Sequence, residues 1–238
     1  MTFFKDILVT RTAKPDRREE HQDHIIRGHS HLVMSTSAFD GVFERFTMNR
    51  VLADSDETEA TTLYRRDPEA LVVVEHQCVS REAFAAASRD PEYLARVKPD
   101  EQYMASEVLS GPPVAYDIWQ DQIVFSDVAT GPYVIFDFLA RPAPVSPVEF
   151  AKALRREGET LSADSEYRAA VSKRVHDLVG TTPSLYAVDG VEHDAVVETW
   201  VRDFTVLRPL LDRLRVLQRG YVDTDSSFSV ITFQTVVV

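Results

Sequence analysis

Four of the seven histidines lie within eleven residues near the start of the chain. They are His21, His24, His29 and His31. Histidine titrates near neutral pH, so its imidazole can both accept and return a proton. On an α-helix with about 100° per residue, His24 and His31 share one face, whereas His29 points elsewhere. Such a segment could catalyse enolisation, an aldol cyclisation or the loss of water.

Acid–base catalysis by His29 is the first interpretation of this segment. Asp100 would orient the imidazole of His29 or act as a partner base. A structural role is the alternative, in which the histidines are polar residues on a partly exposed helix and Asp100 caps a helix end. The predicted catalytic residues are His29 and Asp100, and the two interpretations stay open at this point.

A metal site is a third interpretation of the same segment. The candidate ligands are His21, His24 and His31, together with Glu20 or Asp23. Imidazole and carboxylate groups are suitable ligands for a transition metal. The spacing matches no recognised zinc pattern, however, because HExxH is absent and the chain has a single cysteine. We therefore expect no metal.

Aromatic side chains could line a pocket for a planar ligand. The candidates are Tyr64, Tyr103, Trp119 and Trp200. A place in the ordinary core is the alternative for each of them. The predicted substrate-binding residues are His24, Tyr64, Tyr103 and Trp119.

Signatures of several enzyme classes are missing. There is no G-x-S-x-G, no Gly-rich phosphate loop and no G-x-G-x-x-G, and the chain has only eight glycines. This absence argues against nucleotide-loop enzymes.

The first half of the chain alternates between strand and helix patterns. Strands are expected at residues 3–11, 41–52, 70–77 and 114–125, and helices at 16–34, 81–87 and 91–100. The second half begins with a strand at 132–139. Ser146 and Glu149 have the spacing of a capping box, so a helix should begin there and continue, in pieces, to about residue 179. Further elements are expected as a short strand at 185–188, a strand at 196–201, a helix at 204–217 and a strand at 228–238.

The predicted order is β-α-β-β-α-β, twice, which is the ferredoxin-like or split-βαβ unit. The fold class is therefore α+β, with domains at residues 1–126 and 127–238. Each unit packs its helices on one face of an antiparallel sheet and leaves the other face apolar. The second half can cover that face of the first, so the chain is expected to be a monomeric pseudo-dimer or a homodimer.

Three stretches of the first half carry a family resemblance: 7–11 in the opening strand, 19–33 in the histidine-rich helix, and 84–101 in the second helical region. In these stretches the chain resembles the EthD-like members of the dimeric α+β barrel superfamily. In the second half Gly158 stands where the family's histidine is expected. The resemblance therefore implies a single pocket, in the first half, between the sheet and its helices.

The resemblance also implies a function. Relatives commonly act without a cofactor on aromatic or polyketide-like molecules, as cyclases, dehydratases or oxygenases. The leading hypothesis is a cofactor-independent enzyme of secondary metabolism that promotes cyclisation or dehydration by acid–base catalysis. A cofactor-free monooxygenase and a non-catalytic binding or carrier protein are the alternatives.

Overall charge limits the partners. The formal net charge is -12 and the pI is about 5.0, which disfavours binding to nucleic acids and to anionic membranes. No apolar run approaches the roughly 20 residues of a transmembrane helix. We therefore expect a cytoplasmic protein whose partner is an apolar or aromatic small molecule.

Overall fold

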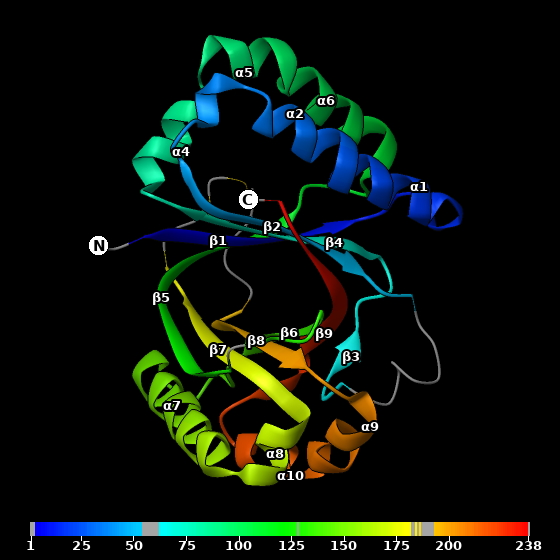
Figure 1. Cartoon of the computed structure of the whole chain (residues 1–238). Coiled ribbons are helices and arrows are strands. Elements are labelled where there is room, and N and C mark those ends of the chain that lie inside the picture. Colours follow the sequence, from blue (N-terminus) through cyan, green and yellow to red (C-terminus); the bar gives the residue numbers. More distant parts are fainter. Residues whose placement is uncertain are drawn as a thin grey trace.

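The computed structural model describes residues 3–53, 62–127, 129–181, 184, 186 and 193–237. Its first half contains two helical regions and five strands (Figure 1). The strands are β1 (Phe4–Arg11), β2 (Phe43–Val51), β3 (Arg65–Arg66), β4 (Ala70–Cys78) and β5 (Val114–Ser126). The first helical region comprises η1 (Pro15–Arg17), α1 (Arg18–Asp23), η2 (His24–His29), α2 (Ser30–Met34) and η3 (Ser37–Phe39). The second comprises α4 (Arg81–Ala87), α5 (Pro91–Arg96), α6 (Lys98–Tyr103) and η4 (Met104–Val108).

The second half repeats this order. Its strands are β6 (Tyr133–Ala140), β7 (Val171–Val179), β8 (Ala195–Val201) and β9 (Asp223–Val236). Its helices are α7 (Pro147–Ala163), α8 (Ser165–Ala170), α9 (Phe204–Leu207), η5 (Arg208–Leu210) and α10 (Leu211–Gln218). The capping box at the start of α7 is confirmed, since Ser146 accepts a hydrogen bond from the Glu149 amide while the Glu149 side chain accepts one from the Ser146 amide.

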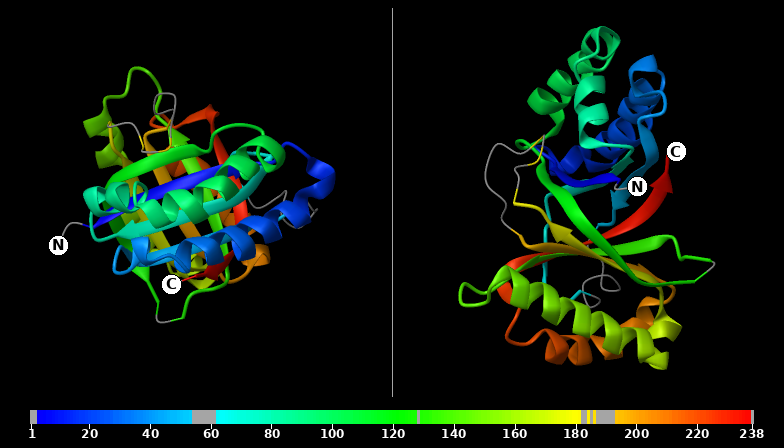
Figure 2. Two further views of the ribbon diagram at one scale, coloured as in Figure 1. Left: turned by 90° about the horizontal axis from the view of Figure 1, so that it is seen from above. Right: turned by 90° about the vertical axis from the view of Figure 1, so that its left-hand side faces the viewer.

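The strands of both halves form one closed sheet. Among the described residues, eight antiparallel strands follow one another in the order β2-β4-β1-β5-β7-β8-β6-β9, and pairing of β2 with β9 closes the ring. The short β3 runs parallel to β9 outside this ring. The two halves therefore meet as two curved sheets with helices on the far side of each (Figures 1 and 2). The expected α+β fold, two ferredoxin-like units packed as an intramolecular barrel, is confirmed.

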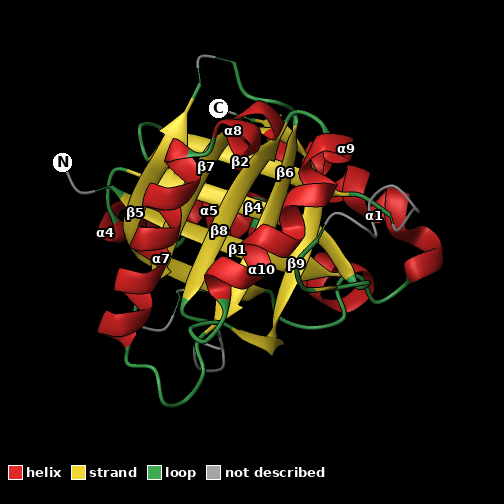
Figure 3. Cartoon of the chain, turned by 90° about the horizontal axis from the view of Figure 1, so that it is seen from below, coloured by secondary structure: helices red, strands yellow, loops and turns green. Residues whose placement is uncertain are grey.

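Alternation along each strand separates an outer face from an inner face. On β1, Phe4 and Leu8 point outward to the helices, whereas Ile7 and Val9 join a core inside the barrel. Helices α7, α8, α9 and α10 cover the outer face of the second half (Figure 3). At one end of the barrel the stacked rings of Phe138 and Phe228 fill the interior.

One predicted element is wrong. The helix expected to continue to residue 179 ends at α8, and residues 171–179 form strand β7. Val171 and Val175 fit a helical spacing as well as a strand, and the pairing of β7 with both β5 and β8 decides between them. Of the short strand expected at 185–188, only residue 186 is among the described residues, so this expectation stays a prediction. The boundary at 126/127 stays a prediction, although β5 ends at Ser126.

The described helices are too short or too polar for a membrane. No helix in this part of the chain is long and apolar enough to cross one.

Candidate functional site

The predicted catalytic pair lies in the helical layer of the first half. Asp100 on α6 accepts hydrogen bonds from two imidazoles, from His24 Nε2 at 3.0 Å and from His29 Nδ1 at 2.9 Å. Segment η2 is a π-helix, whose wider turn bonds residues five apart. That turn brings His24 and His29 to the same side, whereas a regular α-helix would have separated them. We call His24, His29 and Asp100 the histidine cluster.

The histidine cluster is largely satisfied by its own members. The hydrogen bond from His29 is the largest cause that lowers the pKa of Asp100 below its ordinary value. Asp100 and His29 are each 14 % exposed at the side chain, and both oxygens of Asp100 are engaged. Tyr103 completes the group with its ring edge-on to His24, at 5.4 Å between centroids. The structure thus brings together four of the six predicted site residues.

The other two predicted site residues lie elsewhere. Tyr64 is buried in the core of the second half, where its hydroxyl donates to Gln218. Trp119 is 65 % exposed and lies on β5, at the edge of the barrel interior.

The candidate metal ligands do not converge. His21 is buried against Thr12, at 3.1 Å from Nδ1 to Oγ1, while His31 is exposed. Within the described ranges, no group of three or more His, Cys, Asp or Glu side chains could hold a metal ion.

The space between sheet and helices is filled in the first half. Twenty buried side chains form one core there, including Phe46, Phe84 and Tyr93. We expected the apolar pocket at this place. The described side chains instead leave their larger cavity on the opposite face of the same sheet, inside the barrel.

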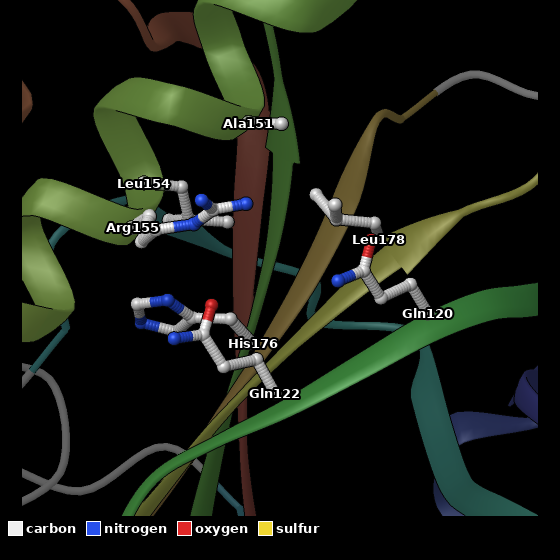
Figure 4. Close-up of a pocket in the computed structure, with 7 residues that line it drawn as sticks. All are labelled: Gln120, Gln122, Ala151, Leu154, Arg155, His176 and Leu178. Carbon is white, nitrogen blue, oxygen red and sulfur yellow. The ribbon is translucent and has the colours of Figure 1, made fainter.

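The corresponding space of the second half holds a small cavity of about 10 Å³ between α7 and strands β5 and β7 (Figure 4). His176 and Gln122 lie beside each other there, below the helix that carries Leu154 and Arg155. Such a volume accommodates about one water molecule, which excludes a substrate.

A buried polar network fills the rest of this layer. The guanidinium of Arg174 donates to Glu157, to Tyr167 at 2.9 Å and to His176 at 3.0 Å. Tyr221 donates to the second oxygen of Glu157. Arg174 and Glu157 are almost completely buried, at 2 % and 1 % side-chain exposure. Because the charges of Arg174 and Glu157 are paired with each other, this network links α7 to the sheet. Nδ1 of His176 is the atom of the ring that has no hydrogen-bond partner among the described residues.

The interior of the barrel contains a cavity of about 450 Å³, within the usual range for small-molecule sites. We call it the barrel cavity. Its apolar lining comprises Phe3, Ile118, Trp119, Ile123, Val175 and Trp200. Its charged lining comprises Lys5, Arg45, Glu75, Asp121, Lys173 and Glu198. The lining comes from β1, β2, β4, β5, β7 and β8, so neither half could form the cavity alone.

Lys5 is the centre of an ion-pair group in this cavity. Its ammonium donates to Glu198 and, at 2.9 Å, to Asp177. These two carboxylates raise the pKa of Lys5 well above its ordinary value despite its burial. Burial raises the pKa of Asp177. Lys5 therefore stays protonated, and its charge is compensated by neighbouring groups of the protein.

Glu75 differs from its neighbours in the barrel cavity. Burial and, next, the negative charge of Glu198 raise the pKa of Glu75 to about 7. One of its oxygens accepts a hydrogen bond of 2.7 Å from Asn49. A carboxyl group that titrates near neutral pH can both accept and donate a proton, as general acid–base catalysis requires. Sequence reasoning missed Glu75, because its spacing in the β4 pattern carries no chemical signal.

His76 is a second residue that sequence reasoning missed. It follows Glu75 on β4, so its ring points to the helical side, where Nδ1 lies 2.7 Å from Asp6 Oδ1. The ring lies among Phe43, Phe46 and Phe84. Alternation could have placed His76 and Asp6 on the same face, but the pairing of β1 with β4 was needed to put them opposite each other.

The fold is shared with proteins of several described activities. An anthrone oxidase-like protein superposes with a TM-score of 0.60 at 12% identity, covering 99% of this chain and 94% of that one. A candidate monooxygenase from Lactobacillus acidophilus NCFM gives 0.52 at 12% identity, covering 98% and 94%. Chlorite dismutase from Candidatus Nitrospira defluvii, in complex with imidazole, gives 0.51 at 10% identity, covering 97% and 91%. At these identities the likeness shows the fold alone.

The sequence itself matches one family. No protein of curated function matches it. The family model described as the EthD domain matches residues 14–107, which run from the start of η1 through η4 and include the histidine cluster and Glu75. Over residues 14–107 this chain is therefore similar to the EthD domain family.

Proposed function

We propose that this chain is a cofactor-independent enzyme that acts by acid–base catalysis on an aromatic or polyketide-like small molecule bound in the barrel cavity. The observation that carries the proposal is Glu75, a carboxyl group with a pKa near neutrality in a cavity of about 450 Å³. The EthD domain and the described activities of structural relatives support a small-molecule enzyme.

The proposed reaction is a proton transfer at carbon. The Glu75 carboxylate would take a proton from a carbon next to a substrate carbonyl, leaving an enolate. Protonated Glu75 would then return a proton to the same carbon, which completes an exchange, to the enolate oxygen, which completes an enolisation, or to a departing hydroxyl group, which completes a dehydration.

Anthrone is a suitable probe, because it is planar and its C10 proton is removed on enolisation. We expect the wild-type protein to accelerate exchange of this proton for deuterium in D₂O under argon, followed by NMR. Glu75→Gln should lose this acceleration, whereas Glu82→Gln, on the exposed face of α4, should retain it. Equal exchange by wild type and Glu75→Gln would contradict the proposal.

A cofactor-free monooxygenase is the second candidate. It is favoured by the descriptions of two structural relatives, the anthrone oxidase-like protein and the candidate monooxygenase. The same probe separates the two. An oxygenase would consume O₂ and convert anthrone to anthraquinone in air, whereas a proton-transfer enzyme would exchange deuterium without oxygen. A binding protein would retain the molecule unchanged.

The histidine cluster remains a competing location for the acid–base group. His29 and Asp100 are held in a hydrogen-bonded pair, as a catalytic dyad requires. His29→Ala in the anthrone assay tests this assignment directly, because loss of exchange in that variant with full activity of Glu75→Gln would return the role to His29.

A further inference from the structure

Two cations in the barrel cavity differ from Lys5 in having no carboxylate partner. Neither Arg45 nor Lys173 forms an ion pair with another residue that the structure describes, whereas Lys5 bonds to both Asp177 and Glu198. Both side chains are only partly exposed. In a chain with a formal net charge of -12, two such cations in one cavity form a local site of positive potential.

Neutral groups hold the two cations in place. Lys173 Nζ lies 3.9 Å from the centroid of the Trp200 ring, in a cation–π contact. Arg45 donates to the side-chain oxygen of Gln234 at 3.3 Å, and Trp200 Nε1 donates to the same oxygen at 3.4 Å. These contacts orient Arg45 and Lys173. Neither cation forms an ion pair among the described residues, while the charges of Glu198 and Glu75 act on Lys173 from within the same cavity.

One buried donor beside this pair of cations has no acceptor in the described part of the chain. Because both neighbours of Gln234 are donors, its oxygen must face them, and its amide nitrogen then points away. That nitrogen is buried and has no hydrogen-bond partner among the described residues. Burial lowers the pKa of Lys173; the charge of Glu198 raises it, and the charges of Arg45 and Lys5 lower it. A bound anion would favour the charged form of Lys173.

We propose that the barrel cavity binds a planar molecule that carries a carboxylate, with Arg45 and Lys173 binding the carboxylate beside Trp200. This inference rests on the proposed function only in placing the substrate in the barrel cavity, and it names the substrate class. The carboxylate is the recognised group and does not react. Glu75 and Lys5 lie in the same cavity, where the carbon skeleton would meet the acid–base group.

The test compares two matched probes, 2-naphthoate and its neutral isostere 2-naphthamide, by isothermal titration calorimetry at neutral pH. We expect the wild-type protein to bind naphthoate about tenfold or more tightly than naphthamide, the difference expected of a charge-assisted contact. Arg45→Met and Lys173→Met should each remove most of this preference and leave the naphthamide affinity within about twofold. Lys152→Met, which removes an exposed charge on α7, should preserve the preference.

The outcomes separate this inference from the proposed catalysis. Equal affinity of the wild type for the two probes, or no binding of naphthoate, would overturn the anion site. A preference that survives in both Met variants would also overturn it. Arg45→Lys keeps the charge and should therefore keep part of the preference. This variant shows whether the loss in Arg45→Met comes from the missing charge and not from a folding defect. Preference for naphthoate in a Glu75→Gln protein would uphold the anion site even if Glu75 proves not to be catalytic.

Discussion

Ionisable groups on the two faces of the closed sheet differ in how they are bonded. On the outer face, under the helices, such groups bond to one another: Asp100 accepts from two imidazoles, and Arg174 is enclosed by Glu157 and its neighbours. On the inner face, Glu75, Arg45 and Lys173 border a cavity of about 450 Å³. The inner face therefore has both the space and the uncommitted charge that a ligand requires.

This difference teaches that a cluster of chemically capable residues is not by itself a site. The charged groups of the histidine cluster and of the Arg174 network are bonded within the protein. On the inner face Lys5 is paired in the same way, whereas Arg45 and Lys173 have no ion pair among the described residues, and part of their interaction energy remains available to a bound molecule.

The largest effect should come from the inner face. Glu75→Gln keeps the size of the side chain but removes the proton-transferring group, so we expect catalysis of anthrone exchange to fall by a factor of about 100 to 10,000. The measurement is the exchange rate relative to the exposed Glu82→Gln control. A comparable loss in His29→Ala alone would reverse the contrast between the two faces.

The outer face should instead govern stability. Glu157→Gln leaves the buried guanidinium of Arg174 without a counter-charge, so we expect it to lower the free energy of unfolding by about 3–5 kcal/mol. Urea denaturation followed by circular dichroism measures this loss. Asp212→Asn, at an exposed ion pair with Arg215, should change stability by less than about 0.5 kcal/mol. A loss below about 1 kcal/mol for Glu157→Gln would show that the network contributes little.

The pH dependence of stability should show that the folded protein disfavours the charged form of Glu75. Its pKa is raised from 4.5 to about 7 in the folded chain, so between these values the folded state binds more protons than the unfolded state. The free energy of unfolding should therefore fall as pH rises through this window, by about 1–2 kcal/mol more in the wild type than in Glu75→Gln. Urea unfolding of both proteins across the window measures the difference. Parallel curves would place Glu75 in an ordinary, solvated environment.

The histidine cluster should change the pH dependence of stability in the opposite direction to Glu75, and by the smallest amount. Its hydrogen bond from His29 lowers the pKa of Asp100, so the folded state binds fewer protons than the unfolded state below the ordinary value of 3.8. The stabilisation is present above that value and is lost as pH falls through the lowered pKa. We expect Asp100→Asn to remove about 1 kcal/mol at neutral pH and to flatten the acid side of the stability curve. An unchanged acid limb in this variant would mean that the two imidazoles contribute nothing to folding.

Much of the fold could be predicted from the chain alone. The alternation in residues 4–11, the capping box at Ser146 and the leucine spacing in 204–217 are local signals that set the type of each element. Repetition of the β-α-β-β-α-β order then restricts the topology. Residues 171–179 were assigned to helix because their local spacing is ambiguous, and pairing with β5 and β8 is a long-range property.

The candidate site was predicted only in part. Proximity of His29 to Asp100 was expected, but the π-helical turn that adds His24 to the pair is a departure from regular geometry that no residue pattern indicated. Lys5, Glu75, Lys173 and Trp200 are separated by up to 195 positions in the chain, and each is unremarkable in its own strand.

The element types, the two-fold repeat and the acidic charge follow from the amino-acid sequence, because they depend on residue identity and near neighbours. Which ionisable groups are paired and which border a cavity depends on how the strands close into a barrel. Alternation places each strand residue on one face or the other, but closing the ring of strands makes one face an interior. In that interior, burial and neighbouring charges set the protonation of Glu75, and both depend on residues from either half of the chain.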